Sequence, residues 1–464
     1  MRAAVVPPDL EALRQLPRDE LSPPDPLVLF VDGFVDSLDL DGLGFLASRR
    51  PSWRAPHSTS KLLKLFLFAG ILGLVSMRAM ARACRWDLRL LYLSHDDPPK
   101  RSSIGRFWRA NYQAFFRVFE TLVRRAAEAG LVGMDLHAVD GTKMRAASSM
   151  HTGLHRESLQ KKLTTLDAQL TKLEGRRASM SAREQGWLFE RTTEQRSQVL
   201  EQLARLDEQG LNPYHPREPD ARVMRVDPRP LFAYNAQAVV DHEHDLIVAV
   251  GMTVDENDFG QLVPMVEETR RLLGEAAQQT VADKGYAAGQ QLDQAEKRHL
   301  PVLVDAQAES DKGLLPKSCF TYDKEQDVYV CPTGELLSLE HSRKMSHDAL
   351  YETAIYRCHN AGCPERSGCS SDKKGRAVKR TPFDDASERQ RARLAQPPLR
   401  ILYELRKEII EHHFGNIKSN YGFRRFTVRG LAKVFAQFVL ACIASNLRKL
   451  LQNWMAILHP RAHG

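Results

Sequence analysis

Two spacings of apolar residues divide the chain, one typical of helices and one typical of strands. Over residues 1–130 the apolar positions recur every three or four residues, most clearly in 61–77, which predicts amphipathic helices. After the pair Pro98-Pro99, a further helix is expected to begin near Ile104. The sequence therefore predicts an all-α N-terminal region over residues 1–130.

An apolar stretch in this region, Leu65 to Val75, is 11 residues long. It is too short to span a bilayer, so it predicts a buried helix, and no membrane partner is expected. Residues 1–27 contain several prolines and lack the apolar run of a secretory signal. We therefore expect a cytoplasmic protein whose seven cysteines are reduced.

The middle of the chain begins with a strand and its exit turn over 134–144. Leucines then recur at steps of four and three residues, at positions 159, 163, 166, 170 and 173. A break follows near 175–181, and apolar positions return at helical spacing over 188–206. This pattern favours an antiparallel helical hairpin inserted after the first strand, at about 151–210. A coiled-coil dimer is the alternative, although each arm is shorter than the three or four heptads that would argue for it.

From residue 231 the spacing changes to that of strands. Two β-rich runs, 231–240 and 246–254, flank a polar turn and predict a hairpin. Helix and strand then alternate to residue 304, which predicts a mixed sheet flanked by helices, an α/β class. Residues 306–399 show no regular pattern, and helical spacing returns over 399–422 and 428–457.

Three acidic residues in this frame are candidates for chemistry. Asp140 closes Leu-His-Ala-Val-Asp and Asp283 closes Thr-Val-Ala-Asp, and a glycine follows each within two residues. Strands of open α/β sheets present carboxylates in this way at their carboxyl ends. Glu411, in a basic C-terminal helix, would complete a cage for Mg²⁺, and a pair of such ions can clamp the attacking and leaving oxygens of a phosphodiester. The sequence therefore predicts metal-dependent chemistry on nucleic acid.

Length and charge are consistent with this prediction. The 464 residues are too many for one hydrophobic core, so two to four units are expected. The net charge is +8 and the pI is near 9.1, which suits a phosphate-bearing partner. The expected helix after Ile104 interleaves aromatic residues with arginines that could meet DNA phosphates, chiefly Arg106 and Arg109. The alternative is an amphipathic helix whose aromatic residues belong to a core.

Several motifs follow one another in a specific order along nearly the whole chain. They are Val139-Asp140-Gly141-Thr142-Lys143, Tyr234-Asn235-Ala236-Gln237, Asn257-Asp258, Ala282-Asp283-Lys284-Gly285-Tyr286, and the run from Glu411 to Lys418. In these motifs the chain resembles the DDE transposases of bacterial insertion sequences, in a branch with a cysteine-bearing insert. The resemblance implies an RNase H-like core over 131–305, interrupted by the hairpin. It also implies a cysteine-bearing insertion at 306–399 and C-terminal helices at 400–464 that complete the core.

The resemblance also selects the third acid. Glu404, Glu408 and Glu411 would share one face of a continuous helix, so spacing alone does not choose among them. A family signature of Tyr, Arg, Glu and Lys matches Tyr403, Arg406, Glu411 and Lys418. This chain has four residues between Arg and Glu where the better-known form has three. The resemblance implies that Asp140, Asp283 and Glu411 hold Mg²⁺ or Mn²⁺, and that Tyr403, Arg406 and Lys418 contact DNA beside the scissile bond.

Four cysteines in the irregular region form a second candidate site. Cys331, Cys358, Cys363 and Cys369 provide four soft ligands, which suit Zn²⁺ and would stabilise an insert with little core of its own. Their spacing is wider than that of a typical zinc knuckle, so reduced cysteines without metal are the alternative.

These observations predict a transposase that cuts and rejoins DNA at the ends of its own element. The expected partners are double-stranded DNA, both terminal inverted repeats and target, and a second copy of the chain in a dimer on DNA. Such a protein would be associated with the nucleoid in the cytoplasm. The alternatives are a catalytically inactive or co-opted DNA-binding protein, and a metal-dependent nuclease of the same core without strand transfer.

Overall fold

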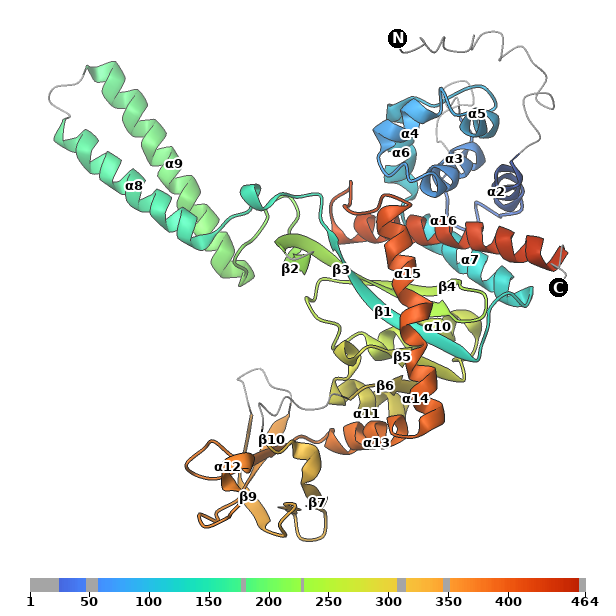
Figure 1. Cartoon of the computed structure of the whole chain (residues 1–464). Coiled ribbons are helices and arrows are strands. Elements are labelled where there is room, and N and C mark those ends of the chain that lie inside the picture. Colours follow the sequence, from blue (N-terminus) through green and yellow to red (C-terminus); the bar gives the residue numbers. More distant parts are fainter. Residues whose placement is uncertain are drawn as a thin grey trace, which may run out of the picture.

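The computed structural model describes residues 25–46, 57–176, 181–226, 229–306, 314–344 and 351–458 (Figure 1). The expectation that residues 1–27 hold no secretory signal falls almost entirely outside the described residues. Most of the turn expected at 175–181 also lies outside them.

The described residues of the N-terminal region form six helices. They are α2 (Pro26–Asp36), α3 (Thr59–Ile71), α4 (Met77–Ala83), α5 (Leu88–Ser94), α6 (Arg101–Asn111) and α7 (Ala114–Glu128). The central helix, α3, is buried from Lys61 to Ile71, and Lys64 is compensated there by ion pairs to Asp32 and Asp36. It ends six residues earlier than the spacing predicted, because Gly73 adopts a left-handed φ of 69° that turns the chain away. The predictions of a helical N-terminal region and of a buried apolar helix are confirmed.

A six-stranded mixed sheet forms the centre of the molecule. Its strands are β1 (Leu136–Arg145), β2 (Arg222–Val226), β3 (Arg229–Asp241), β4 (Ile247–Thr253), β5 (Gln279–Ala282) and β6 (Val302–Val304). The long strand β3 pairs antiparallel with β1 on one side and with β2 and β4 on the other. On its far side β1 pairs parallel with β5, which pairs parallel with β6. The predicted mixed sheet is confirmed, but the sequence reading missed β2, a short strand with charged residues.

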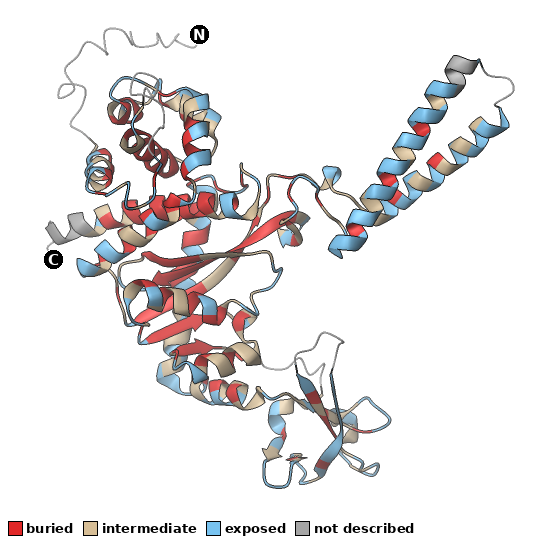
Figure 2. Ribbon diagram, turned by 180° about the vertical axis from the view of Figure 1, so that it is seen from behind, coloured by how far each residue is buried: buried red, intermediate tan, exposed pale blue. Residues whose placement is uncertain are grey.

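Helices cover the sheet and connect its strands. They are α10 (Leu262–Leu273), η4 (Lys284–Tyr286), α11 (Gly289–Lys297), α13 (Asp384–Leu394), α14 (Pro397–Glu404), α15 (Arg406–Ser419) and α16 (Leu431–Leu458). Helix α10 packs on β3 and β4, and α15 crosses β1 and β3 on the face turned to the viewer in Figure 1. Figure 2 shows that the sheet, α3 and α16 form the continuous buried interior.

Helix α16 lies inside this interior. Its segment Leu431–Asn453 is long and apolar enough to cross a membrane by length and composition, but 78% of it is buried against the rest of the protein. The amide side chain of Asn446 bonds both the N–H and the C=O of Ile247, at 2.9 and 2.7 Å. A helix that satisfies the backbone of an edge strand in this way is a core element of the fold.

A helical hairpin projects from the sheet between β1 and β2 (Figure 1). It consists of α8 (Arg156–Gly175) and α9 (Ala182–Gln209), preceded by the short η2 (Met150–Thr152). A narrow apolar seam joins the two helices through Leu159, Leu166, Val199 and Leu206. Ion pairs between Arg196 and Asp167 and between Arg156 and Asp207 flank the seam.

A second projection lies between β6 and α13. It contains η5 (Lys317–Cys319), β7 (Thr321–Asp323), β8 (Val328–Val330), β9 (Leu336–Lys344), β10 (Glu352–Arg357), α12 (Arg366–Cys369) and β11 (Ala377–Arg380). The strands form an antiparallel sheet in the order β11-β10-β9-β8-β7. The expectation of no regular structure over 306–399 was therefore wrong for the described residues. These strands are short, and most residues of β9 are exposed, so the alternation that reveals a strand is absent.

Candidate active site

The first two predicted acids meet at one edge of the central sheet. Strands β1 and β5 are parallel, with Val139 opposite Ala282, so Asp140 and Asp283 are the next residues along each strand. The backbone N–H of Gly141 donates to Asp140 Oδ1 at 2.8 Å, and that of Lys284 donates to Asp283 Oδ1 at 2.7 Å. Two carboxylates from neighbouring strands are thus held side by side by local backbone contacts.

A third carboxylate, that of Asp258, approaches both loops. Its Oδ1 accepts hydrogen bonds from Asn235 Nδ2 and Gln237 Nε2, both at 2.7 Å. A Cβ on Gly141 would collide with Gln237 Nε2 and lie 2.6 Å from this same oxygen, so a larger residue would displace these side chains. The hydroxyl of Tyr286 donates to Gln237 Oε1 and extends the network beneath the two aspartates.

Sequence reasoning missed Asp258 as a site residue, although Asn257-Asp258 is one of the motifs of the resemblance. A further signal was the pair Asn235 and Gln237 in an apolar strand. Alternate residues of a strand lie on one face, so both amides point the same way. Both are buried, at 1% and 0% exposure. Buried amides require polar partners, and here the partner is a carboxylate.

Burial dominates the electrostatics of this cluster. It raises the pKa of Asp140 to about 6, while the Gly141 N–H and the Arg406 guanidinium oppose the rise, and Asp283 and Asp258 add to it. Burial and the negative charges of Asp258, Asp140 and Asp283 likewise raise the pKa of Tyr286 well above its usual value. Three carboxylates that influence one another in this way favour a bound cation.

Arg406, predicted to contact DNA, lies inside the cluster. Its Nη2 is 3.7 Å from Asp283 Oδ1, and only 8% of the residue is exposed. Its Nε is buried without a hydrogen-bond partner. The ring of Tyr403 lies 6.0 Å from its guanidinium. The structure therefore places Arg406 and Tyr403 as neighbours of the acids, with the arginine as their counter-charge.

Glu411, the predicted third acid, is exposed on α15. Among the described residues, Asp140, Asp283 and Glu411 do not form a group whose ligand atoms all lie within 4.8 Å of one another. Successive helical residues are rotated by about 100°, so Glu411 and Lys418, seven residues apart, share a flank. His412, the next residue, contacts Asp245 in the turn between β3 and β4.

The expectation that Glu404, Glu408 and Glu411 share one face of one helix is wrong for Glu404. A break at Leu405 separates α14 from α15, and Glu404 ends the earlier helix. Its carboxylate pairs with Arg400 at 3.0 Å on the surface. No glycine or proline marks the break, so the sequence carries no signal for it.

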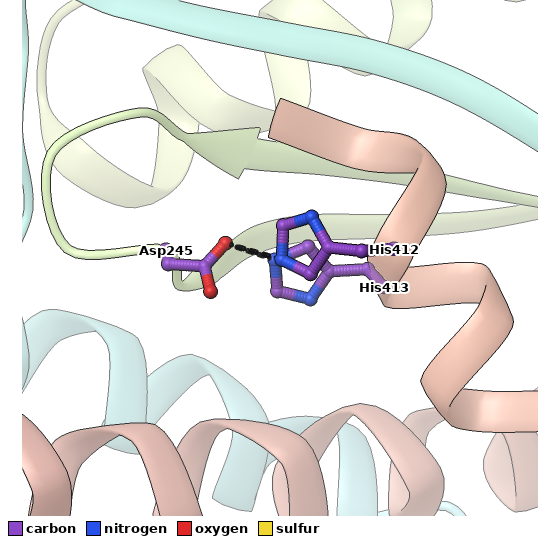
Figure 3. A group of neighbouring side chains, drawn as sticks. All are labelled: Asp245, His412 and His413. Carbon is purple, nitrogen blue, oxygen red and sulfur yellow. Dashed lines mark hydrogen bonds and ion pairs between the residues drawn. The ribbon is translucent and has the colours of Figure 1, made fainter. Parts of the chain in front are cut away.

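A separate cluster ties α15 to the turn between β3 and β4 (Figure 3). Asp245 Oδ1 lies 2.6 Å from His413 Nε2 and 2.8 Å from His412 Nε2. These ligand atoms could hold a metal ion, but Lys449 of α16 already pairs with the other carboxylate oxygen. Burial opposes ionisation of Asp245, yet the contacts from His413 and Lys449 prevail and lower its pKa. The cluster thus fastens α15 and α16 to the sheet.

The N-terminal candidates lie apart from these clusters, on α6. Arg106 and Arg109 are exposed, whereas Phe107 and Trp108 are buried against Phe66. The aromatic residues of this helix are core residues, as the alternative held, and its arginines face solvent. Elsewhere, Cys331, Cys358, Cys363 and Cys369 are free thiols of intermediate exposure in the cysteine-bearing projection.

Residues 330–451 match the family model of the transposase DDE domain. The resemblance to DDE transposases is thereby confirmed for the C-terminal region. The match includes Arg406, Glu411 and Lys418. It begins after Asp140 and Asp283, which are therefore outside it. Such a domain implies an RNase H-like fold, a polynucleotidyl transferase and hence a DNA transposase. Comparisons with curated proteins and with solved structures gave no match.

Proposed function

We propose that this protein is a DNA transposase that cleaves and joins DNA at the ends of its own mobile element. The observation that carries the proposal is the pairing of Asp140 with Asp283 on adjacent parallel strands, in a chain whose C-terminal region is a transposase DDE domain. The same pair would also serve a nuclease of this core or remain in an inactive DNA-binding copy. Those two functions are outcomes of the tests below.

The donor set fits a divalent metal. Asp140, Asp283 and Glu411 supply carboxylate oxygens, the ligands that Mg²⁺ and Mn²⁺ prefer. Burial is the main cause of the raised pKa of Asp140, and the charges of Asp283 and Asp258 add to it, so a bound cation would favour the ionised carboxylate. When bound, the metal supplies charge stabilisation at the scissile phosphate and a lowered pKa for the attacking hydroxyl.

The protein's own residues set the geometry for this chemistry. Gly141 allows Asp258 to approach, and the amides of Asn235 and Gln237 fix Asp258 in place. Asp258 thereby acts as a positioning residue beneath Asp140. Arg406 balances the charge of Asp283 before metal and DNA bind.

Glu411 would supply the third carboxylate if α15 moved towards the two strands. Lys418, seven residues later on the same side of α15, would contact the DNA backbone. The contacts of Asp245 with His412 and His413 limit how far the helix moves.

The exposed arginines of α6 recognise the terminal inverted repeats through phosphates or base edges. We further propose that two copies act together on DNA, because two element ends must be held at once, and that the protein works in the cytoplasm at the nucleoid.

A charge-matched pair of variants tests the choice of third acid. Glu411→Gln should abolish Mg²⁺-dependent cleavage of terminal-repeat DNA and retain DNA binding. Glu408→Gln, an exposed glutamate of the same helix, is the control and should cleave like the wild type. Equal cleavage by both variants would remove Glu411 from the site, and equal loss in both would show that the helix tolerates neither change.

A further inference from the structure

The topology of the cysteine-bearing projection places two cysteines at the same edge of its sheet. Strands β8 and β10 both pair antiparallel with β9, so they run parallel to each other on either side of it. Cys331 directly follows β8, and Cys358 directly follows β10. Two thiols separated by 26 residues of sequence therefore lie at the same end of the sheet, where β8 and β10 finish.

The other two cysteines lie in the loop that returns to this edge. Arg357, the last residue of β10, is opposite Ala377, the first of β11, so the connection begins and ends here. Cys363 and Cys369 are in that connection, with Cys369 at the end of α12. Gly375, with a φ of 102°, lies against the carbonyl oxygen of Cys358, where a Cβ would collide with it. This close approach folds the loop back onto the strand end.

Packing agrees with this placement. Three cysteines of the set, Cys331, Cys358 and Cys369, pack at the rim of one small apolar cluster.

The turn after β8 is arranged to receive a thiolate. Gly334 N–H donates to Cys331 C=O at 2.9 Å and closes the turn. Glu335 N–H points to Cys331 Sγ at 3.3 Å, and Thr333 Oγ1 lies 3.0 Å from the same sulfur. Hydrogen-bond donors directed at a sulfur suit the thiolate, which is the form of cysteine that binds metal.

The apolar interior of the projection is too small to explain its order. Among the described residues of the projection, Ile355 is buried on its own and only five buried residues form a cluster: Phe320, Tyr329, Leu337, Tyr356 and Val378. Folded units with so little core usually need a disulfide or a metal. All four cysteines are free thiols, so no disulfide fills this role.

We propose that Cys331, Cys358, Cys363 and Cys369 bind one Zn²⁺ ion as four thiolates and so stabilise this projection. Four protein ligands leave no open position, which makes the site structural and separate from the DNA chemistry. Among the described residues, no three of these sulfurs lie within 4.8 Å of one another, so the four side chains would have to move together around the ion. Zinc held by thiolates is tetrahedral, with bonds to sulfur of about 2.3 Å.

Metal analysis of the full-length protein purified from zinc-containing medium tests the proposal. About one zinc per chain is expected. It should be lost in the Cys363→Ser, Cys369→Ser double variant and retained in Cys319→Ser, an exposed cysteine of the same projection. Replacement by Co²⁺ should give the intense thiolate absorption of a tetrahedral four-sulfur site.

A second measurement uses the wild-type chain alone, in case the double variant does not fold. Chelation should make residues 314–380 sensitive to limited proteolysis, and added Zn²⁺ should restore resistance. Wild-type protein that contains no zinc, takes up none and resists proteolysis would overturn the proposal, as would zinc retained by the double variant. Neither readout involves DNA cleavage, so failure here is distinct from failure of the proposed transposase activity.

Discussion

Replacing Asp140 with Asn should make the metal-free protein more stable at neutral pH, although it removes a predicted catalytic group. Burial is the main reason that the pKa of Asp140 is raised from 3.8 to about 6 in the folded chain. Asn has nearly the same shape and keeps an oxygen that can accept the N–H of Gly141. It therefore removes the buried charge with little change in packing.

The size of the effect follows from the pKa difference. A carboxyl whose folded pKa exceeds its unfolded value stabilises the fold when protonated, and this contribution is lost as the pH rises through the folded pKa. The rise in the pKa of Asp140 from 3.8 to about 6 corresponds to about 3 kcal/mol of unfolding free energy. The protein has this stability below pH 3.8 and has lost it above about pH 7. The side chain keeps partial solvent contact, so about 3 kcal/mol is the upper limit.

Urea unfolding of metal-free wild type and Asp140→Asn at several pH values measures this difference. The variant should be the more stable protein at pH 8, and its advantage should shrink as the pH falls from 7 towards 4. Asp135→Asn, which removes an exposed carboxylate just before the same strand, controls for the loss of one negative charge. Saturating Mg²⁺ should stabilise the wild type more than Asp140→Asn. A variant that is less stable than wild type at pH 8, or an advantage independent of pH, would refute the assignment of a buried, charge-crowded Asp140.

Three further predictions follow from the site and from α6. Gly141→Ala places a Cβ 2.6 Å from Asp258 Oδ1, so the rate of DNA cleavage should fall by about tenfold or more. Binding to terminal repeats, measured by gel shift, should persist. Unchanged cleavage would show that the approach of Asp258 is dispensable. Arg406→Met removes a charge that lowers the pKa of Asp140, so the acid limb of the cleavage–pH profile should move to higher pH, and a shift to lower pH would contradict the placement of Arg406. Joint replacement of Arg106 and Arg109 by Ala should weaken binding to terminal repeats by about 1–3 kcal/mol if either reads a base edge. If both contact only phosphate, all sequences should weaken alike and the salt slope should fall by about one per contact, and unchanged affinity would move recognition away from α6.

The central sheet was predictable because its information is local. Short apolar runs that end in Asp and are followed by Gly identified β1 and β5, and their parallel pairing brings Asp140 and Asp283 together. The helical N-terminal region was predictable for the same reason. The burial of α3 follows from the run of apolar residues in its own sequence.

The remaining features depend on contacts between distant segments. Asp258 lies in a polar turn, and only the folded chain shows that Asn235 and Gln237 direct it towards Gly141. The break at Leu405 has no glycine or proline to announce it, so the glutamates on its two sides appeared to share one helix. The strands of the cysteine-bearing projection carry exposed side chains that conceal their period.

The most direct test of the central claim is a strand-transfer assay with full-length protein, the element's own terminal DNA, a target duplex and Mg²⁺. The wild type should cleave the ends and join them to the target, and both steps should stop with a chelator. Asp283→Asn should bind the same DNA and produce neither product, because it removes one of the two carboxylates that meet at the sheet edge. The account would be contradicted if Asp283→Asn cleaved and joined DNA at the wild-type level. If the wild type nicked DNA without joining it, the protein would be a nuclease. If the wild type bound DNA without cleaving it, the protein would be an inactive copy.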